Sequence, residues 1–83
     1  MARTPSPAAA LVGTNIRELR QQRSYSPDDL ASMTKIDSSN IRAYEAGRSL
    51  IGLHSLVKVA TALGVEPGRL LDGLELSMFE KQS

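Results

Sequence analysis

Apolar residues recur at intervals of three and four positions along most of the chain, which is the spacing of one face of an α-helix. Val12, Ile16 and Leu19 follow this spacing in the first third of the sequence. In residues 53–64 the same spacing places five apolar residues on one helical face: Leu53, Leu56, Val59, Ala60 and Leu63. No segment alternates apolar and polar residues as a half-buried strand does. The pattern predicts an all-α fold, a compact bundle of about five short helices.

A helix start signal follows the first helix. Ser26 can cap a second helix, because its hydroxyl can accept a hydrogen bond from an amide of the first turn. This helix is expected to end by Thr34, with three residues facing inward: Leu30, Ala31 and Met33.

A third helix is predicted for residues 38–46. Asp37 caps its start, and Gly47 ends it, because glycine adopts a left-handed backbone conformation without steric cost. Ile41 and Tyr44, three positions apart, form its inner stripe. The other side chains of this helix are therefore expected to point outward.

The C-terminal part of the chain is rich in apolar residues. Pro67 begins a last short helix, with Leu70 and Leu71 inside and Gly73 after it. The tail beyond it contains Leu74, Leu76, Met78 and Phe79. The chain thus divides into a flexible N-terminal arm (1–7), a helical domain (8–73) and an apolar tail (74–83).

Composition limits how this fold can be stabilised. The 83 residues include no cysteine, so apolar packing, within the domain or across a subunit interface, must replace disulfides and thiolate metal sites. No apolar run is long enough to span a membrane, and a cytoplasmic location is expected. The formal net charge of +1 does not by itself indicate a nucleic-acid partner.

Several segments together resemble the helix-turn-helix domain of the phage repressor and Cro (XRE) family. The matching features are "IRELR", "SPDDLA", the core position Ile41, "YEAG" and "LVKVATALGV", in this order between Val12 and Leu71. The resemblance implies a lambda-repressor-like fold in which residues 38–46 are the recognition helix. It also implies an ion pair between Arg20 and Glu45 that ties the first helix to the third; the alternative is that both are solvated surface charges.

In this family the recognition helix lies in the major groove. With Ile41 and Tyr44 buried, the predicted base-reading residues are Ser38, Ser39, Arg42 and Ala43. Arg42 can donate two hydrogen bonds to guanine, which gives roughly 1–3 kcal/mol of discrimination between bases. The alternative is that Arg42 contacts a phosphate or is only solvated.

Other residues flank this helix and are predicted to contact phosphates, which position a protein without reading sequence. They are Lys35, Asn40, Arg48 and Ser49. Arg3, in the N-terminal arm, either enters a minor groove or belongs to a disordered leader.

Three positions depart from the family pattern. Lys35 replaces the turn glycine, so it must adopt φ > 0 or distort the turn. Pro27 replaces a common glutamine and removes a backbone N–H that can contact phosphate. Ile51 stands where a proline is often found.

Members of this family commonly bind DNA as dimers, with half-sites about 34 Å apart. The predicted interface residues are Leu70, Leu71, Leu74, Leu76, Met78 and Phe79. The alternative is that the tail folds back onto its own core.

The sequence therefore predicts a homodimeric transcriptional regulator that binds a two-fold symmetric site in double-stranded DNA. It predicts no enzyme activity, metal, cofactor, small-molecule ligand or membrane partner: His54 is isolated, and Asp28 and Asp29 point about 100° apart on a helix. The alternative function is a protein-interaction module, such as an antitoxin or a partner of another regulator, whose binding would depend less on salt. The loop "GRSLIGL" and the chain length also resemble the controller proteins of restriction–modification systems.

Overall fold

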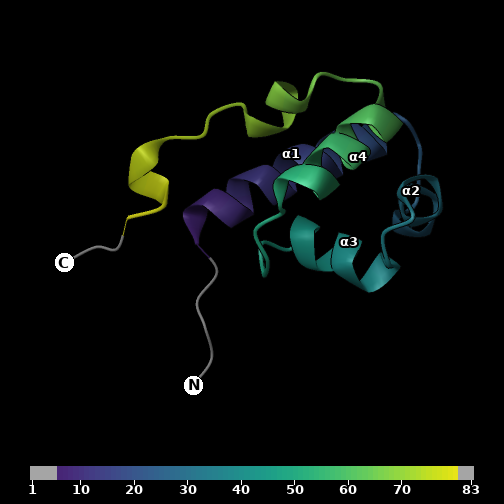
Figure 1. The fold of residues 1–83 in the computed structure, drawn as a ribbon, viewed down its shortest axis with the longest axis horizontal. Helices are drawn as coiled ribbons and strands as arrows, with labels where there is room; N and C mark the ends of the chain where they lie inside the picture. The colour runs from purple at the N-terminus through teal and green to yellow at the C-terminus, as the bar shows by residue number, and fades with distance from the viewer. Residues whose placement is uncertain (1–5, 81–83) are drawn as a thin grey trace.

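Six helical segments are present in the computed structural model, which describes residues 6–80 (Figure 1). The four α-helices are α1 (Pro7–Gln22), α2 (Pro27–Thr34), α3 (Ser38–Glu45) and α4 (Leu53–Leu63). Two 3-10 helices follow, η1 (Pro67–Leu71) and η2 (Leu76–Met78). Residues 6–80 contain no strand, and the all-α prediction is confirmed. The last predicted helix is η1, a 3-10 turn, because Pro67 and Gly73, which has φ 87°, leave room for little more than one turn.

Side-chain caps begin the first three helices, at Ser26 and Asp37 as predicted and also at Ser6. The Ser6 hydroxyl accepts a hydrogen bond from the Ala9 N–H at 3.0 Å. Ser26 and Asp29 form a reciprocal capping box, each side chain accepting from the other's N–H at 2.9 Å. These bonds satisfy amides that a helix start leaves without partners, so the starts of α1 and α2 are fixed by local sequence.

The turn between α2 and α3 keeps the geometry of a glycine although it contains a lysine. Lys35 has φ 62° and ψ 27°, a left-handed conformation that is uncommon for residues with a Cβ. Thr34 supports the turn: its hydroxyl donates to the Leu30 carbonyl at 2.8 Å and accepts from the Ile36 N–H at 3.3 Å. Lys35 therefore adopts φ > 0 and the turn is retained.

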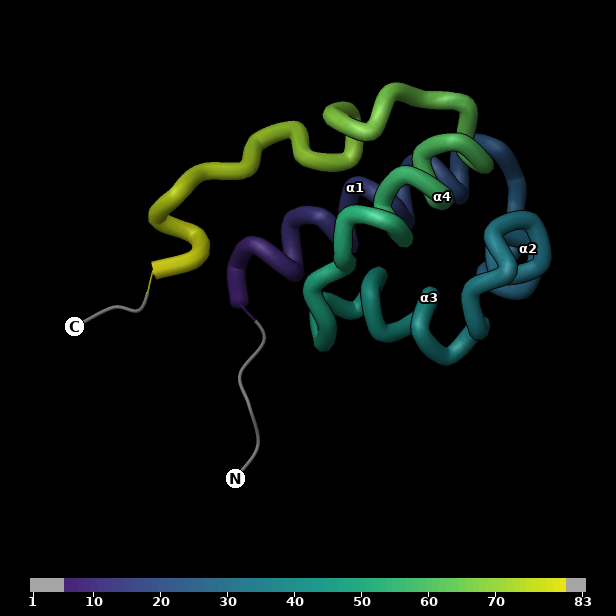
Figure 2. Tube along the Cα trace, viewed as in Figure 1, coloured from purple at the N-terminus to yellow at the C-terminus, as the bar shows by residue number. Residues whose placement is uncertain are grey.

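The core lies where α1, α2, α3, α4 and η1 meet. Its largest fully buried side chains are Ile16, Leu30, Ile41, Val59, Leu63 and Leu70. α3 packs on α1 and α2, and α4 packs on α2 and η1. After α4 the chain turns back over α1 and then runs to the end of the molecule where α1 begins (Figure 2).

Two residues predicted to face inward are exposed. Met33 lies on the flank of α2, because Leu30 and Thr34 define its buried face. Leu53 is in the first turn of α4, where no described element covers it. The predictions for these two side chains were wrong, although those for Leu30 and Leu63 are confirmed.

A glycine in the middle of α1 permits the closest approach of two helices. A Cβ atom at Gly13 would lie 2.1 Å from the carbonyl oxygen of Tyr44 and 2.8 Å from that of Glu45. Gly47, with φ 77°, likewise lies against Ala10, whose Cα would be 2.9 Å from an added Cβ. The C-terminal end of α3 therefore rests directly on the backbone of α1.

We expect Gly13→Ala to lower the free energy of unfolding by about 3 kcal/mol, because backbone atoms of α3 would have to move. Gly68→Ala is the matched control, since an added Cβ there meets no atom within 4 Å. Chemical denaturation followed by circular dichroism measures both. Equal stabilities of the two variants would contradict the close approach.

Candidate nucleic-acid interface

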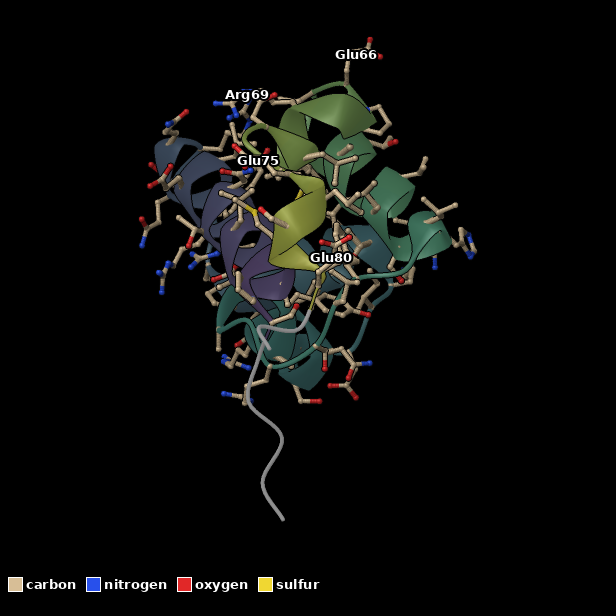
Figure 3. The ribbon with its side chains drawn as sticks, turned by 90° about the vertical axis from the view of Figure 1, so that its left-hand side faces the viewer. Glu66, Arg69, Glu75 and Glu80 are labelled. Atoms are coloured by element: carbon tan, nitrogen blue, oxygen red, sulfur yellow. The ribbon has the colours of Figure 1, made fainter. Side chains whose placement is uncertain are left out.

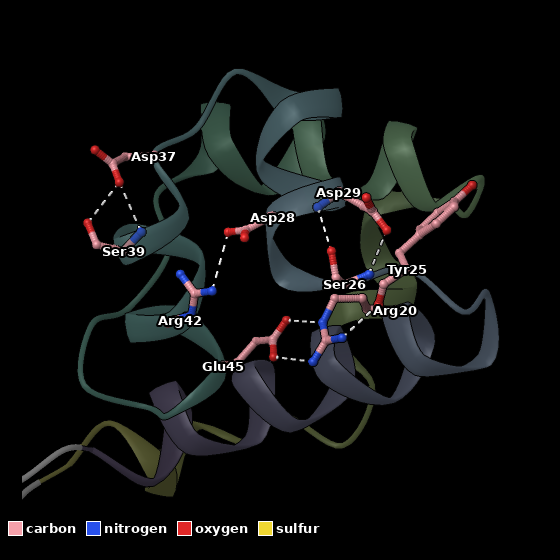
Figure 4. Close-up of polar contacts among 9 residues, drawn as sticks. All are labelled: Arg20, Tyr25, Ser26, Asp28, Asp29, Asp37, Ser39, Arg42 and Glu45. Carbon is pink, nitrogen blue, oxygen red and sulfur yellow. Dashed lines mark hydrogen bonds and ion pairs between the residues drawn. The ribbon is translucent and has the colours of Figure 1, made fainter.

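A buried ion pair joins α1 to the last residue of α3. The Arg20 Nε lies 2.6 Å from Glu45 Oε2, and Nη2 donates to Oε1 at 2.9 Å (Figure 4). The two side chains are 10% and 7% exposed. This two-pronged geometry fixes both the distance and the orientation between the helices.

Arg20 also holds the loop before α2. Its Nη1 donates to the Tyr25 carbonyl at 2.8 Å. The hydrogen bond to Glu45 raises the pKa of the Arg20 guanidinium, and this outweighs the opposing effect of burial. One permanently charged group thus connects α1, the loop before α2 and the end of α3.

The outer face of α3 carries the residues predicted to read bases. Ile41 is buried and Tyr44 is partly buried against the core, so the opposite side of the helix is left to solvent. Ser39 and Arg42 are exposed, whereas Ser38 and Ala43 are partly buried. No described element covers this flank, which forms a protruding rod (Figure 1).

Ser39 also takes part in the cap of α3. Its N–H donates to Asp37 Oδ1 at 2.9 Å and its hydroxyl donates to the same oxygen at 3.0 Å. Both bonds lower the pKa of Asp37, the N–H bond more than the hydroxyl bond. Because the folded-state pKa is lowered, this contribution to stability is present above the unfolded-state pKa and is lost as pH falls through the folded value.

The Arg42 side chain bridges α3 and α2. Its Nη2 donates to Asp28 Oδ1 at 3.3 Å, with the two side chains 51% and 72% exposed (Figure 4). This contact could not be predicted from the sequence, because the two residues are 14 positions apart on different helices. The only signal available was that Asp28 and Arg42 lie on the two helices of one helix-turn-helix.

The predicted phosphate-contacting residues lie at both ends of α3 and are all exposed: Lys35, Asn40, Arg48 and Ser49. Lys35 precedes the start of the helix, and Arg48 follows its end. The structure therefore distributes these donors along the length of the rod instead of gathering them at one point. Arg3 and most of the arm 1–7 lie outside the described residues.

The predicted interface residues are divided between core and surface. Leu70 is fully buried in the core of the domain, so its side chain cannot contact a second molecule, and its assignment to an interface was wrong. Leu71 and Leu74 are partly buried against the core, and Met78 is partly buried. Leu76 and Phe79 are 73% and 50% exposed.

The start of the tail and the loop after α3 lie along the first turns of α1. Gly73 lies beside Leu11, and Gly47 beside Ala10. The loop after α3 contains a further exposed apolar residue, Leu50, which was not among the predicted interface residues. Figure 3 views this end of the molecule and shows η2 between Glu75 and Glu80. The exposed apolar residues of the tail, Leu76 and Phe79, thus lie between two acidic residues in the sequence, Glu75 and Glu80.

Two helices joined by a tight turn, with the second exposed on its outer flank, define a helix-turn-helix protein. The model of the helix-turn-helix domain family matches residues 13–76, and the chain belongs to this family, in its Cro/XRE-type branch. It is a DNA-binding transcriptional regulator by class. Within residues 6–80, no helix combines the length and the apolar character needed to cross a membrane.

Two solved structures resemble the chain in sequence as well as in fold. The restriction–modification controller protein C.AhdI from Aeromonas hydrophila is 34% identical, with a TM-score of 0.73 over 75% of this chain and 94% of that one. A hypothetical transcription factor, NHTF, from Neisseria is 32% identical, with a TM-score of 0.74 over 86% of this chain and 84% of that one. A comparison with curated proteins found no match.

We expect Glu45→Ala to lower the free energy of unfolding by about 3 kcal/mol, because it leaves the Arg20 charge buried without its partner. Asp72→Ala is the control: it removes the exposed pair of Arg69 with Asp72, at 3.0 Å, and should change stability by less than about 1 kcal/mol. Thermal and denaturant unfolding measure both. Wild-type stability of Glu45→Ala would argue against a structural role of the buried pair.

Proposed function

We propose that the protein binds specific sites in double-stranded DNA as a homodimer, with α3 in the major groove of each half-site. The observation that carries this proposal is the placement of Arg42. Ile41, its neighbour, is fully buried, and Arg42 therefore lies on the outer flank of α3, half exposed and beside Asp28 of α2. An exposed α-helix of this kind has the dimensions of the major groove.

The chemistry of the outer face favours reading of guanine. Arg42 is the one long basic side chain on this face of α3, and its planar guanidinium matches the O6 and N7 acceptors of guanine. Ser38 can donate to or accept from a base edge and is less selective. The Ala43 methyl group can contact the methyl group of thymine.

Anchoring to the DNA backbone is proposed for the residues on either side of the rod. Lys35 and Asn40 would contact one strand near the start of α3, and Arg48 and Ser49 the phosphates beyond its end. The start of α2 is less suited to this task, because Pro27 lacks an N–H and Asp28 adds negative charge. Anchoring through the ends of α3 is the arrangement that the charges favour.

The tail supports the proposal of a dimer. Leu76 and Phe79 are large, apolar and exposed, and Leu50 in the loop after α3 is exposed as well. Burial of such side chains against a second copy is favourable, and Leu71, Leu74 and Met78 would line the contact. Glu75 and Glu80, beside η2, would be repelled by DNA phosphates, which supports a place for this end of the molecule away from the DNA.

The chain is similar to the restriction–modification controller protein C.AhdI, and a controller of this kind is the subtype that we propose. The regulator would then act on promoters in such a system. The salt dependence of binding distinguishes a DNA partner from a protein partner. Affinity for duplex DNA should fall steeply as salt rises, and weak salt dependence would indicate a protein partner.

Selection of bound duplexes from a random-sequence pool tests sequence-specific binding directly. We expect wild-type protein to select a two-fold symmetric site, and Arg42→Ala to lose roughly 1–3 kcal/mol of discrimination at one base pair of each half-site. Its melting temperature should stay within about 2 °C of wild type because the side chain is exposed. Arg17→Ala, an equal loss of charge from an exposed position on α1, is the control. If the wild-type protein selects no sequence from the pool, the proposal is overturned.

The dimer is tested by analytical ultracentrifugation of the Leu76→Ser, Phe79→Ser double variant. We expect self-association weakened at least tenfold, since two exposed apolar contacts, about 1.5–3 kcal/mol each when buried, are lost. Val57→Ser is the control, because Val57 is similarly exposed but lies on α4 beside Met33 of α2. A double variant that associates as strongly as the wild-type protein would remove the tail from the interface.

A further inference from the structure

The ion pair between Asp28 and Arg42 lies on the surface proposed to face DNA, and it contributes little that the fold requires. Both side chains are more than half exposed, and solvent-exposed pairs of this kind add little to stability. Asp28 is also not needed to begin α2, because the capping box uses Ser26 and Asp29. The pair therefore calls for an explanation outside the stability of the domain.

We propose that Asp28 is a positioning residue that determines specificity by orienting the guanidinium of Arg42. This inference rests on the proposed function, since it assigns to α2 a part in reading the bases that α3 contacts. Asp28 would hold Arg42 in one orientation before DNA binds, so that the side chain favours one base pair over neighbouring bases and phosphates.

The geometry leaves the guanidinium able to bind a base while it is held. Only one contact, from Nη2 to Asp28 Oδ1 at 3.3 Å, joins the two groups. A guanidinium has five N–H donors, and a bidentate contact with guanine uses two of them. Among residues 6–80 the guanidinium makes no other hydrogen bond, so the donors on Nη1, Nε and the second hydrogen of Nη2 can serve this purpose.

The charge of Asp28 reinforces the choice between base and phosphate. A carboxylate repels the phosphate groups of DNA, so an arginine held beside it is less able to serve as a phosphate clamp. A base edge carries no net charge and is affected less. Asp28 should therefore lower affinity for all duplexes slightly while raising the preference of Arg42 for its base pair.

The test compares two duplexes: the site selected from the random pool by the wild-type protein, and the same site with the base pair that depends on Arg42 replaced. The measured quantity is the ratio of the two dissociation constants at fixed salt. We expect Asp28→Ala to bind both duplexes somewhat more tightly, with the ratio reduced roughly 5- to 10-fold, as is typical of coupling between contacting residues.

The control for charge is Glu18→Ala, which removes an equal negative charge from an exposed position on α1 and should leave the ratio unchanged. In a background of Arg42→Ala, Asp28→Ala should also leave the ratio unchanged, because Asp28 acts only through Arg42. Asp28→Asn, which keeps an acceptor oxygen without the charge, should retain part of the ratio. It also replaces Asp28→Ala if that variant does not fold.

If Asp28→Ala shows the same ratio of dissociation constants as the wild-type protein, and the wild-type protein still selects a site, the positioning role is overturned and the proposed function is not. A reduced ratio that persists without Arg42 also overturns it, because Asp28 would then contact DNA itself. If the wild-type protein selects no sequence, the proposed function fails and this inference fails with it. The three results are distinguishable in one set of binding measurements.

Discussion

The buried pair of Arg20 with Glu45 is the interaction on which the presentation of α3 depends. Its carboxylate belongs to Glu45, the last residue of α3. At this point the backbone of α3 rests on α1, because Gly13 has no side chain to separate the two helices. A bidentate contact at 7–10% exposure leaves little freedom of rotation, and Arg20 extends the same restraint to the loop before α2 through Tyr25. The orientation of the outer face of α3 is thus determined by contacts on its inner face.

Much of the fold could be predicted from local sequence. Caps at Ser6, Ser26 and Asp37 and the apolar spacing of α4 act over a few residues, so their consequences can be derived without knowledge of the tertiary structure. The exposure of Met33 and Leu53 could not be predicted in this way. Each lies at the margin of an apolar face, so its burial depends on which neighbour covers it. Gly13 carried a usable signal: a glycine inside a helical pattern costs stability and often marks a close backbone approach.

The candidate site was less accessible to such reasoning. The outward position of Arg42 followed from the burial of Ile41 on the same short helix, and the pairing of Arg20 with Glu45 came from the family resemblance. The contact of Arg42 with Asp28 depends on how two helices cross and on side-chain orientation, neither of which one sequence determines. Leu70 was predicted both to face the inside of a helix and to belong to an interface. It is buried in the core, because η1 packs on α1 and α4.

One side chain on α1 has a consequence for how two copies would be spaced on DNA. The Asn15 amide donates to the carbonyl oxygens of Leu70 and Asp72, at 2.9 and 3.0 Å, and so fastens the segment from which the tail departs. The direction of the tail is then inherited from α1, the same helix that supports α3. In the proposed dimer joined through η2, this attachment would restrict the separation of the two recognition helices. Operators with half-sites one base pair closer or farther apart would then be bound less tightly without any change in base contacts.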